Sequence, residues 1–192
     1  MEMGEESQLV LRARDGDVEA FMMLARKYEQ AIFRLIYRLT KNKEDAADLT
    51  QETFLRAFKG IKEFRLKSNF HTWLHRIAVN VSLNYLKKYR TQNSSTEYID
   101  GLGNKQIESL ADPSPEEKSI SEELQISLEK AIEKLPLTYQ TTFTLVVFQG
   151  MSHREAAKVL GCSENTVSWR MHEIRKILKG ALQPYLNTGL EG

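Results

Sequence analysis

The sequence predicts an all-α protein of two small helical domains joined by a flexible acidic linker. Apolar residues recur at steps of three and four over several long stretches, which is the spacing of one helix face. Val, Ile and Thr never alternate with polar residues over a strand length, so no sheet is expected. Residues 91–120 are acidic and rich in Ser, Thr, Asn, Gly and Pro, which is typical of a linker. We therefore expect domains at 1–90 and 121–192, the second containing a helix-turn-helix.

Three helices are expected in the first domain. Asp17 follows a turn and is placed to cap a helix that begins near residue 18 and ends near residue 39. A second helix should cover about 44–59, with Gly60 marking its end. A third covers 70–88 and begins near Ser68 or Asn69.

The third helix, residues 70–88, has two faces. One is an apolar stripe fit to dock on a core, made of Phe70, Leu74, Ile77, Ala78, Val81 and Tyr85. The other carries Trp73, Arg76, Asn80, Asn84 and Lys87. An amide can pair with a base edge, a cation with phosphate, and an indole can stack on an unpaired base. The alternative is an ordinary amphipathic helix whose polar face is only solvated.

Charge is unevenly distributed although the net charge is only +1. Residues 59–90 contain eight cations against one anion, and residues 97–123 contain eight anions against two cations. A basic block followed by an acidic one can hide a polyanion-binding surface in a neutral total. The single cysteine, Cys162, fits a reducing cytosol, no signal peptide opens the chain, and the long uncharged run at 135–153 is too polar for a membrane span. We expect a cytoplasmic protein.

The second domain should begin with two helices. One covers about 124–135 and is stopped by Pro136, and the next covers 138–149 and is closed by Gly150.

A helix-turn-helix should follow. Ser152 and Glu155 have the spacing of a capping box, and a short helix follows them. Gly161 makes the turn, and Ser163 caps a longer helix that runs to about Lys179.

The longer helix also has two faces. Its inward positions are Val167, Met171, Ile174 and Leu178, and its outward positions are Asn165, Ser168, Trp169, His172 and Lys176. The outward face is expected to enter a DNA groove, with phosphates in reach of Arg170, Arg175, Lys176 and Lys179. Alternatively, Trp169 packs on a neighbouring domain or on the linker.

Taken together, these segments resemble the sigma-70 family of bacterial transcription initiation factors. The resemblance spans about 17–182 and is to the small extracytoplasmic-function (group IV) members, in the sigma-E branch. DAADLTQETFLRAF at 45–58 is similar to the family's core-polymerase-binding segment. FHTWLHRIAVN at 70–80, followed by NYL, is similar to the −10 promoter segment, and the terminal helix-turn-helix is similar to the −35 reader.

The resemblance implies a partner for the 45–58 segment. Asp48, Gln51 and Glu52, with Phe54 beside them, would bind a coiled coil of the largest polymerase subunit, while the second domain would meet the polymerase flap. The three polar residues fall on one helix face, which suits such a contact. The alternative is that this is only the acidic N-terminal end of a helix, favoured by the helix dipole; it fits Asp45 and Asp48 better than Gln51 and Glu52.

The resemblance also implies the DNA-binding residues. Asn80 would read an extruded base of the non-template strand, so that melting resembles base flipping. The implied −10 set is Trp73, Arg76, Asn80, Asn84, Lys87 and Lys88. The implied −35 set is Asn165, Thr166, Ser168, Trp169, Arg170, His172, Arg175 and Lys176.

Further partners follow from the same resemblance. They are promoter DNA and an anti-sigma factor that masks both domains in unstressed cells, so that any link to a membrane is indirect. No catalytic residue, metal, cofactor or small-molecule substrate is expected.

The chain departs from the family's pattern at both DNA-reading helices. Many relatives have Asp and Arg where this chain has Asn84 and Lys87. Relatives often read G-T-V-[KR]-S-R where this chain reads NTVSWR, and they carry a later basic residue where this chain has Glu173. We expect an altered −35 preference, with thymine-methyl or sugar contacts from Trp169 and weaker phosphate anchoring.

Three other classes of protein remain as alternatives. An ordinary helix-turn-helix regulator would leave the first domain's motifs without a role, and a protein-only adaptor would not need the basic ridge. An enzyme is the third alternative, since His71 and His75 stand at i, i+4 and could be metal ligands. They lack the Glu of an HExxH motif and a third ligand. Cys162 suits a small packed residue better than a redox sensor.

Overall fold

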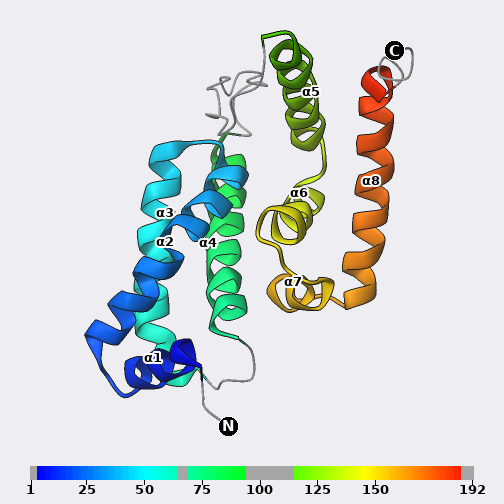
Figure 1. Ribbon diagram of the computed structural model, residues 1–192. Helices are drawn as coiled ribbons and strands as arrows, with labels where there is room; N and C mark the ends of the chain where they lie inside the picture. The colour runs from blue at the N-terminus through cyan, green and yellow to red at the C-terminus, as the bar shows by residue number, and fades with distance from the viewer. Residues whose placement is uncertain (1–3, 65–68, 94–114, 187–192) are drawn as a thin grey trace.

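The computed structural model describes residues 4–64, 69–93 and 115–186, and within these ranges every regular element is helical (Figure 1). The elements of the first half are α1 (Glu5–Arg14), α2 (Val18–Thr40), α3 (Lys43–Gly60), the 3₁₀ turn η1 (Ile61–Glu63) and α4 (Phe70–Asn93). Those of the second half are α5 (Pro115–Glu133), α6 (Leu137–Phe143), the π-helical turn η2 (Thr144–Phe148), α7 (His153–Leu160) and α8 (Glu164–Leu186). The predicted all-α class with two helical domains is confirmed.

The helices are longer than predicted on both sides of the proposed linker. α4 continues to Asn93 and α5 already begins at Pro115, so helix replaces part of the stretch 91–120. Residues 94–114 and Ser68 lie outside the described residues, and the domain boundaries stay predictions. α8 likewise continues past the predicted end at Lys179.

Local capping explains where the helices of the first half begin. Asp17 accepts a hydrogen bond from the backbone N–H of Ala20 at 3.0 Å, which confirms the predicted cap of α2. The side chain of Asn42 accepts from the N–H groups of Glu44 and Asp45 at the start of α3. α3 ends at Gly60 as predicted, although the chain turns once more as η1.

The sequence reasoning missed α1. This helix packs on α2, and its Glu6 pairs with the Lys27 ammonium and accepts a hydrogen bond from the Tyr28 hydroxyl at 2.7 Å. Val10 and Ala13 are its buried side chains. A short helix with two core residues leaves only a weak periodic signal.

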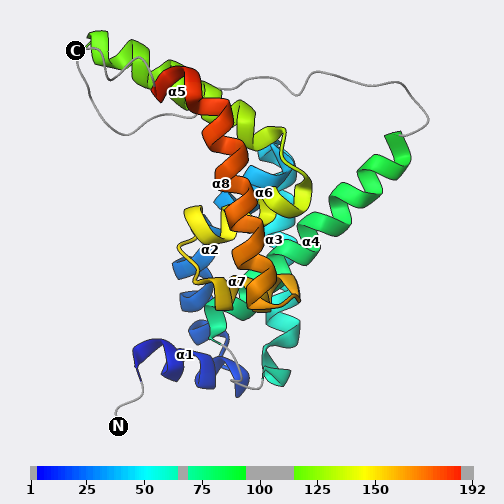
Figure 2. The same cartoon turned by 90° about the vertical axis from the view of Figure 1, so that its right-hand side faces the viewer.

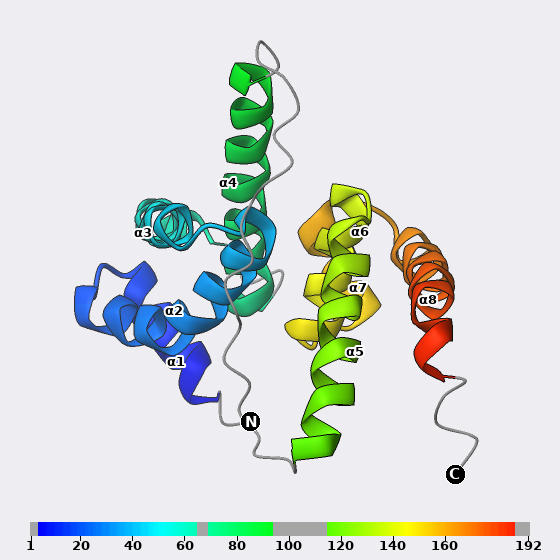
Figure 3. The ribbon, with the colours of Figure 1, turned by 90° about the horizontal axis from the view of Figure 1, so that it is seen from above.

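The two halves lie side by side. α4 and α2 face α7, α6 and η2, and α8 lies on the far side of the second half (Figures 1 and 3). Viewed from that side, α8 crosses in front of the molecule (Figure 2). Within the described ranges, no helix combines the length and the apolar run that a membrane crossing requires.

Candidate nucleic-acid interface

The predicted apolar stripe of α4 is its core face. Phe70, Leu74, Ala78 and Val81 are buried against α2 and α3, while Ile77 and Tyr85 are half-buried. Opposite this stripe, solvent reaches four side chains along one ridge, which we call the α4 ridge: Arg76, Asn80, Asn84 and Lys87. Lys88 is exposed beside it. The ridge offers amides for base edges and cations for phosphates, as the sequence predicted.

Trp73 does not stand out from α4 as expected. Its ring centroid lies 5.0 Å from that of Phe64 and 5.6 Å from that of Phe70, and the side chain is half-buried. The end of α3 also lies beside the indole, since a Cβ at Gly60 would be in ordinary van der Waals contact with its Cζ2 atom, at 3.5 Å. Periodicity placed Trp73 outward, but the aromatic side chains before and beside it close over the ring. The indole therefore has a packing role at the start of α4.

α4 has a second buried face that the sequence reasoning missed. Thr72, His75, Val79 and Ser82 are at most 3% exposed, and α7 packs on α4. These side chains are polar or small, so their pattern looked like a solvated flank. α4 is thus buried on two sides, although only the stripe that contains Phe70 and Leu74 is strongly apolar.

His75 is the central polar group of this second face. Its Nδ1 lies 2.8 Å from the His71 carbonyl oxygen and its Nε2 lies 3.2 Å from Oε1 of Gln149. Burial, and then the neighbouring His71, lower the pKa of His75 to about 4, although the two acceptors oppose this shift. Both ring nitrogens are thus engaged by protein groups, which speaks against His75 as a metal ligand. Among the described residues no cluster of three or more His, Cys, Asp or Glu side chains could hold a metal ion.

The predicted polymerase-binding residues lie on α3, away from α4. Asp48 and Gln51 are exposed, and Glu52 is half-exposed and accepts a hydrogen bond from Nε of Arg56 at 3.0 Å. Phe54 is half-buried and packs on the core. Leu55, which the sequence reasoning missed, is 61% exposed. Its signal was an apolar residue seven positions after Asp48, on the same helix face.

We call Asp48, Gln51, Glu52 and Leu55 the α3 ridge. Phe58, 45% exposed, continues it by one turn, and its ring meets that of Phe21 with centroids 5.1 Å apart. Asp45 turns to the other flank of α3, where it accepts a hydrogen bond from Tyr85 of α4. The ridge therefore combines carboxylate, amide and exposed apolar groups.

The helix-turn-helix has its predicted local structure. Ser152 and Glu155 form a complete capping box at the start of α7. Gly161 ends α7 with φ of +65°, in the left-handed region that favours glycine. The Ser163 hydroxyl accepts from the N–H of Thr166 at 3.1 Å, which caps α8.

α8 presents the predicted outward face. Its inward residues Val167, Met171, Ile174 and Leu178 are all buried. The exposed residues, which we call the α8 face, are Asn165, Ser168, Trp169, His172, Arg175 and Lys176. Trp169 is 58% exposed, and its ring meets Tyr139 edge-on with centroids 6.2 Å apart.

Two of the predicted α8 residues are partly engaged within the domain. Thr166 shares a hydrogen bond with the Ser163 hydroxyl, and Arg170 donates to the Thr142 hydroxyl at 3.5 Å. Both are half-buried. Ser168 is exposed but lies 2.9 Å from Nδ1 of His153 on α7, a neighbour that the sequence reasoning did not single out.

Comparisons with known proteins assign both halves to one family. The model of Sigma-70 region 2 matches residues 24–92, and the model of Sigma-70, region 4 matches residues 125–178. The chain is 35% identical over 185 residues to the RNA polymerase sigma-H factor of Pseudomonas aeruginosa, covering 95% of this chain and 96% of that protein. It is 32% identical to the ECF RNA polymerase sigma-E factor of Haemophilus influenzae, covering 94% and 97% of the two chains.

Two solved structures share the fold. CnrH in complex with the cytosolic domain of CnrY superposes with a TM-score of 0.70 at 21% identity, covering 94% of this chain and 99% of CnrH. The sigma factor RpoE of Bartonella quintana, in complex with the anti-sigma factor NepR, superposes with a TM-score of 0.67 at 21% identity, covering 87% and 97%.

Proposed function

Because the chain belongs to the sigma-70 family of transcription initiation factors, in its extracytoplasmic-function group, we propose that it directs core RNA polymerase to promoters through its two exposed polar helix faces. The observation that supports this most directly is the pairing of the α4 ridge with the α8 face. One lies in the half that matches Sigma-70 region 2 and the other in the half that matches Sigma-70, region 4, and each leaves amides and cations exposed. Proteins of this family act as initiation factors rather than as catalysts, so the residues bind and position.

The α3 ridge is the proposed contact with the coiled coil of the largest polymerase subunit. Asp48, Gln51 and Glu52 supply polar contacts, and Leu55 adds an apolar one beside them. Phe54 is packed on the core and would hold the α3 ridge in position. The second half would meet the polymerase flap.

The α4 ridge is the proposed −10 surface. Asn80 would hold a base extruded from the non-template strand, and the cations Arg76, Lys87 and Lys88 would hold the backbone. Extrusion costs a few kcal/mol, which a fitting pocket offsets, so melting needs no nucleotide hydrolysis by the factor itself. Trp73 would contribute mainly by fixing the start of α4.

The α8 face is the proposed −35 surface. As the second helix of a helix-turn-helix, α8 would enter the major groove with its N-terminal residues on base edges. Asn165 and Ser168 would meet bases there, and Arg175 and Lys176 would meet phosphates. Trp169 is the exposed apolar group available for thymine methyls or sugars.

We also propose that the chain is a bacterial cytoplasmic protein and that an anti-sigma factor releases it under stress. The support is the family membership together with solved relatives that were captured with CnrY and NepR. Any connection to a membrane would then be indirect.

In vitro transcription with core polymerase on randomised promoters tests the proposal. We expect the chain to confer selection of paired −35 and −10 elements, and Gln51→Ala to lower transcript yield several-fold through weaker polymerase binding. Gln30→Ala is the matched control, because Gln30 is exposed on α2 outside the ridges. If core polymerase gains no promoter selectivity from the chain, an ordinary helix-turn-helix regulator becomes the better explanation.

A second experiment separates melting from binding. Asn80→Ala should reduce permanganate reactivity of the −10 region more than it reduces closed-complex affinity, because the extruded base is held only after opening. An equal loss in both measurements would make Asn80 a general DNA contact.

A further inference from the structure

The α8 face is bordered by other helices on both flanks. α6 and α7 both pack on α8, and their side chains contact three consecutive residues of it: Ser168, Trp169 and Arg170. Because helical spacing turns Ser168 and Arg170 to opposite flanks, α7 borders the face on one side and α6 on the other. The surface that α8 offers to DNA is therefore shaped partly by residues outside α8.

Tyr139 supports the indole of Trp169 on the α6 flank. The two rings meet at 85° with their centroids 6.2 Å apart, which is the edge-to-face arrangement that aromatic pairs favour. Tyr139 is half-buried and packs against the core, so its own ring has little freedom to move. An exposed indole without such a neighbour could exchange among several rotamers. The contact with Tyr139 therefore favours one orientation of Trp169.

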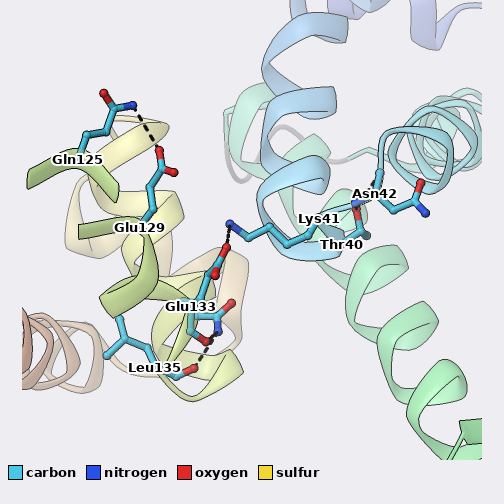
Figure 4. A network of polar contacts seen from close by, with 8 residues as sticks. Thr40, Lys41, Asn42, Gln125, Glu129, Glu133 and Leu135 are labelled. Carbon is cyan, nitrogen blue, oxygen red and sulfur yellow. Dashed lines mark hydrogen bonds and ion pairs between the residues drawn. The ribbon is translucent and has the colours of Figure 1, made fainter. Parts of the chain in front are cut away.

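The position of Tyr139 depends in turn on the corner between α5 and α6. Nε2 of Gln140 donates hydrogen bonds to the carbonyl oxygens of Glu133, at 2.9 Å, and Leu135, at 2.8 Å (Figure 4). These bonds satisfy carbonyl groups at the end of α5, where no further helical turn can do so. The backbone N–H of Tyr139 donates to the Pro136 carbonyl oxygen at 2.8 Å in the same corner. Two successive residues thus fix the start of α6, and with it the ring that meets Trp169.

His153 supports Ser168 on the other flank. Nδ1 of His153, the first residue of α7, lies 2.9 Å from Oγ of Ser168. Whichever of the two atoms donates, this hydrogen bond keeps the Ser168 side chain in one of its staggered rotamers. The capping box of Ser152 and Glu155 fixes the start of α7 from which His153 projects. His153 is therefore a well-anchored neighbour of the α8 face.

We propose that Tyr139 and His153 are positioning residues for −35 recognition, which hold Trp169 and Ser168 in the orientation that binds DNA. This inference rests on the proposed function of the α8 face. Ordering a mobile side chain at an interface costs free energy, so a side chain already held in its bound orientation binds more tightly. A held side chain also adapts less readily to a wrong sequence. The −35 preference is then set partly by two residues that need not touch a base.

Time-resolved fluorescence anisotropy tests the first contact without DNA or polymerase. Trp73→Phe leaves Trp169 as the single tryptophan of the full chain. In this background, Tyr139→Leu should lower the anisotropy that remains after about 1 ns, because the indole gains fast motion. Tyr139→Phe keeps the ring and should leave this anisotropy unchanged. Equal indole motion in all three proteins would overturn the positioning role of Tyr139.

In vitro transcription with core polymerase measures the effect on recognition. The readout is the −35 ratio: transcription from the −35 sequence that the unaltered chain selects from randomised promoters, divided by transcription after one base pair of that sequence is changed. Tyr139→Leu should lower the −35 ratio about threefold, the scale of one aromatic pair, and Tyr139→Phe should preserve it. In a Trp169→Ala chain, Tyr139→Leu should have no further effect. Equal losses with and without Trp169 would show that Tyr139 acts on the whole domain, and the proposal would fail.

The −35 ratio also tests His153. His153→Ala and Ser168→Ala should each lower it about threefold, the scale of one hydrogen bond. The double variant should lower it no further than one of them does, because both changes remove the same contact. Additive losses would make His153 an independent DNA contact and overturn its positioning role.

Thr141→Val is the matched control on α6. The Thr141 hydroxyl donates to the Leu137 carbonyl oxygen at 2.7 Å, so this bond stays within α6. The variant should leave the −35 ratio unchanged, and a threefold loss would mean that any disturbance of α6 alters the preference, against the proposal. If the unaltered chain shows no −35 preference, the proposed function fails, whereas the anisotropy comparison still decides whether Tyr139 orients the indole.

Discussion

α4 and α8 are the two long helices proposed to bind DNA, yet they are held in different ways. α4 contacts α2, α3 and α7, and it is buried on two sides, along its apolar stripe and along Thr72, His75, Val79 and Ser82. α8 is buried along one stripe only and presents its other side to solvent. The exposed polar surface of α4 is therefore narrower than that of α8, and more residues of α4 than of α8 have structural roles.

The two tryptophans show the consequence. Both occupy positions that helical periodicity places outward, but Trp73 packs among Phe64, Phe70 and Gly60 while Trp169 is 58% exposed. Phe64 and Phe70 pack on the ring of Trp73, whereas among the described residues Trp169 has Tyr139 as its one aromatic neighbour. Substitutions in the two helices should therefore have different effects, mainly on stability in α4 and mainly on promoter preference in α8.

The largest effect is expected from Trp73→Ala. Removing a fully buried tryptophan typically costs 3–5 kcal/mol, and for this half-buried ring we expect a loss of about 2 kcal/mol in the free energy of unfolding. Urea unfolding followed by circular dichroism measures it. Trp73→Phe should recover much of the loss because it restores the aromatic contacts. A loss of less than about 0.5 kcal/mol in the free energy of unfolding would mean that Trp73 has no structural role.

Acidification should destabilise the fold through His75. Its pKa of about 4 in the folded chain lies below the ordinary 6.5, so the folded state binds fewer protons than the unfolded state, and the stability that this group contributes is full above about pH 6.5 and declines toward pH 4. Burial also lowers the pKa of His71. The carboxylates of Glu155 on α7 and Glu6 on α1 oppose this shift, and the Lys27 ammonium on α2 adds to it. Lowering the pH from 7.5 to 5.5 should reduce the free energy of unfolding by about 1.3 kcal/mol, measured by urea unfolding at each pH.

Two variants interpret that titration. His75→Gln should flatten the pH dependence, while His172→Gln, on the exposed face of α8, should leave it intact. Greater stability at pH 5.5 would mean that the two acceptors around His75, the His71 carbonyl and the Gln149 amide oxygen, outweigh burial.

A smaller effect is expected at the cap of α8. Ser163→Ala removes the acceptor for the Thr166 N–H and should cost about 1 kcal/mol of unfolding free energy. Ser163→Asp keeps an acceptor at the cap and should restore the thermal midpoint. If Ser163→Ala leaves the midpoint unchanged, α8 is held by its buried stripe alone.

The smallest effect on stability is expected from Trp169→Ala. The ring has one aromatic neighbour, Tyr139, and is mostly exposed, so unfolding should change by about 0.5 kcal/mol. Its proposed role predicts instead a weaker dependence of transcription on the −35 sequence, by about fivefold. If Trp169→Ala leaves the −35 preference unchanged, Trp169 has a packing role instead.

Much of the fold could be predicted because local chemistry specified it. The Asp17 and Ser163 caps, the capping box of α7 and the turn at Gly161 depend on residues close in sequence, and the structure confirms each. The buried stripe of α8 was equally predictable, since four apolar residues repeat at helical spacing. Leu55 could have been predicted as well, because it lies seven residues after Asp48 on the same face of α3.

The sequence by itself determined the helices, their caps and the stripes that face each domain's own core, because these depend on spacing along one segment. Tertiary structure alone decided that α1 packs on α2, that Trp73 is half-buried, and that His75 and Val79 are buried on a second face of α4. A polar or small side chain has the same local pattern whether water or another domain lies over it. Only the approach of the second half, where Gln149 meets His75 and α7 contacts α4, distinguishes the two.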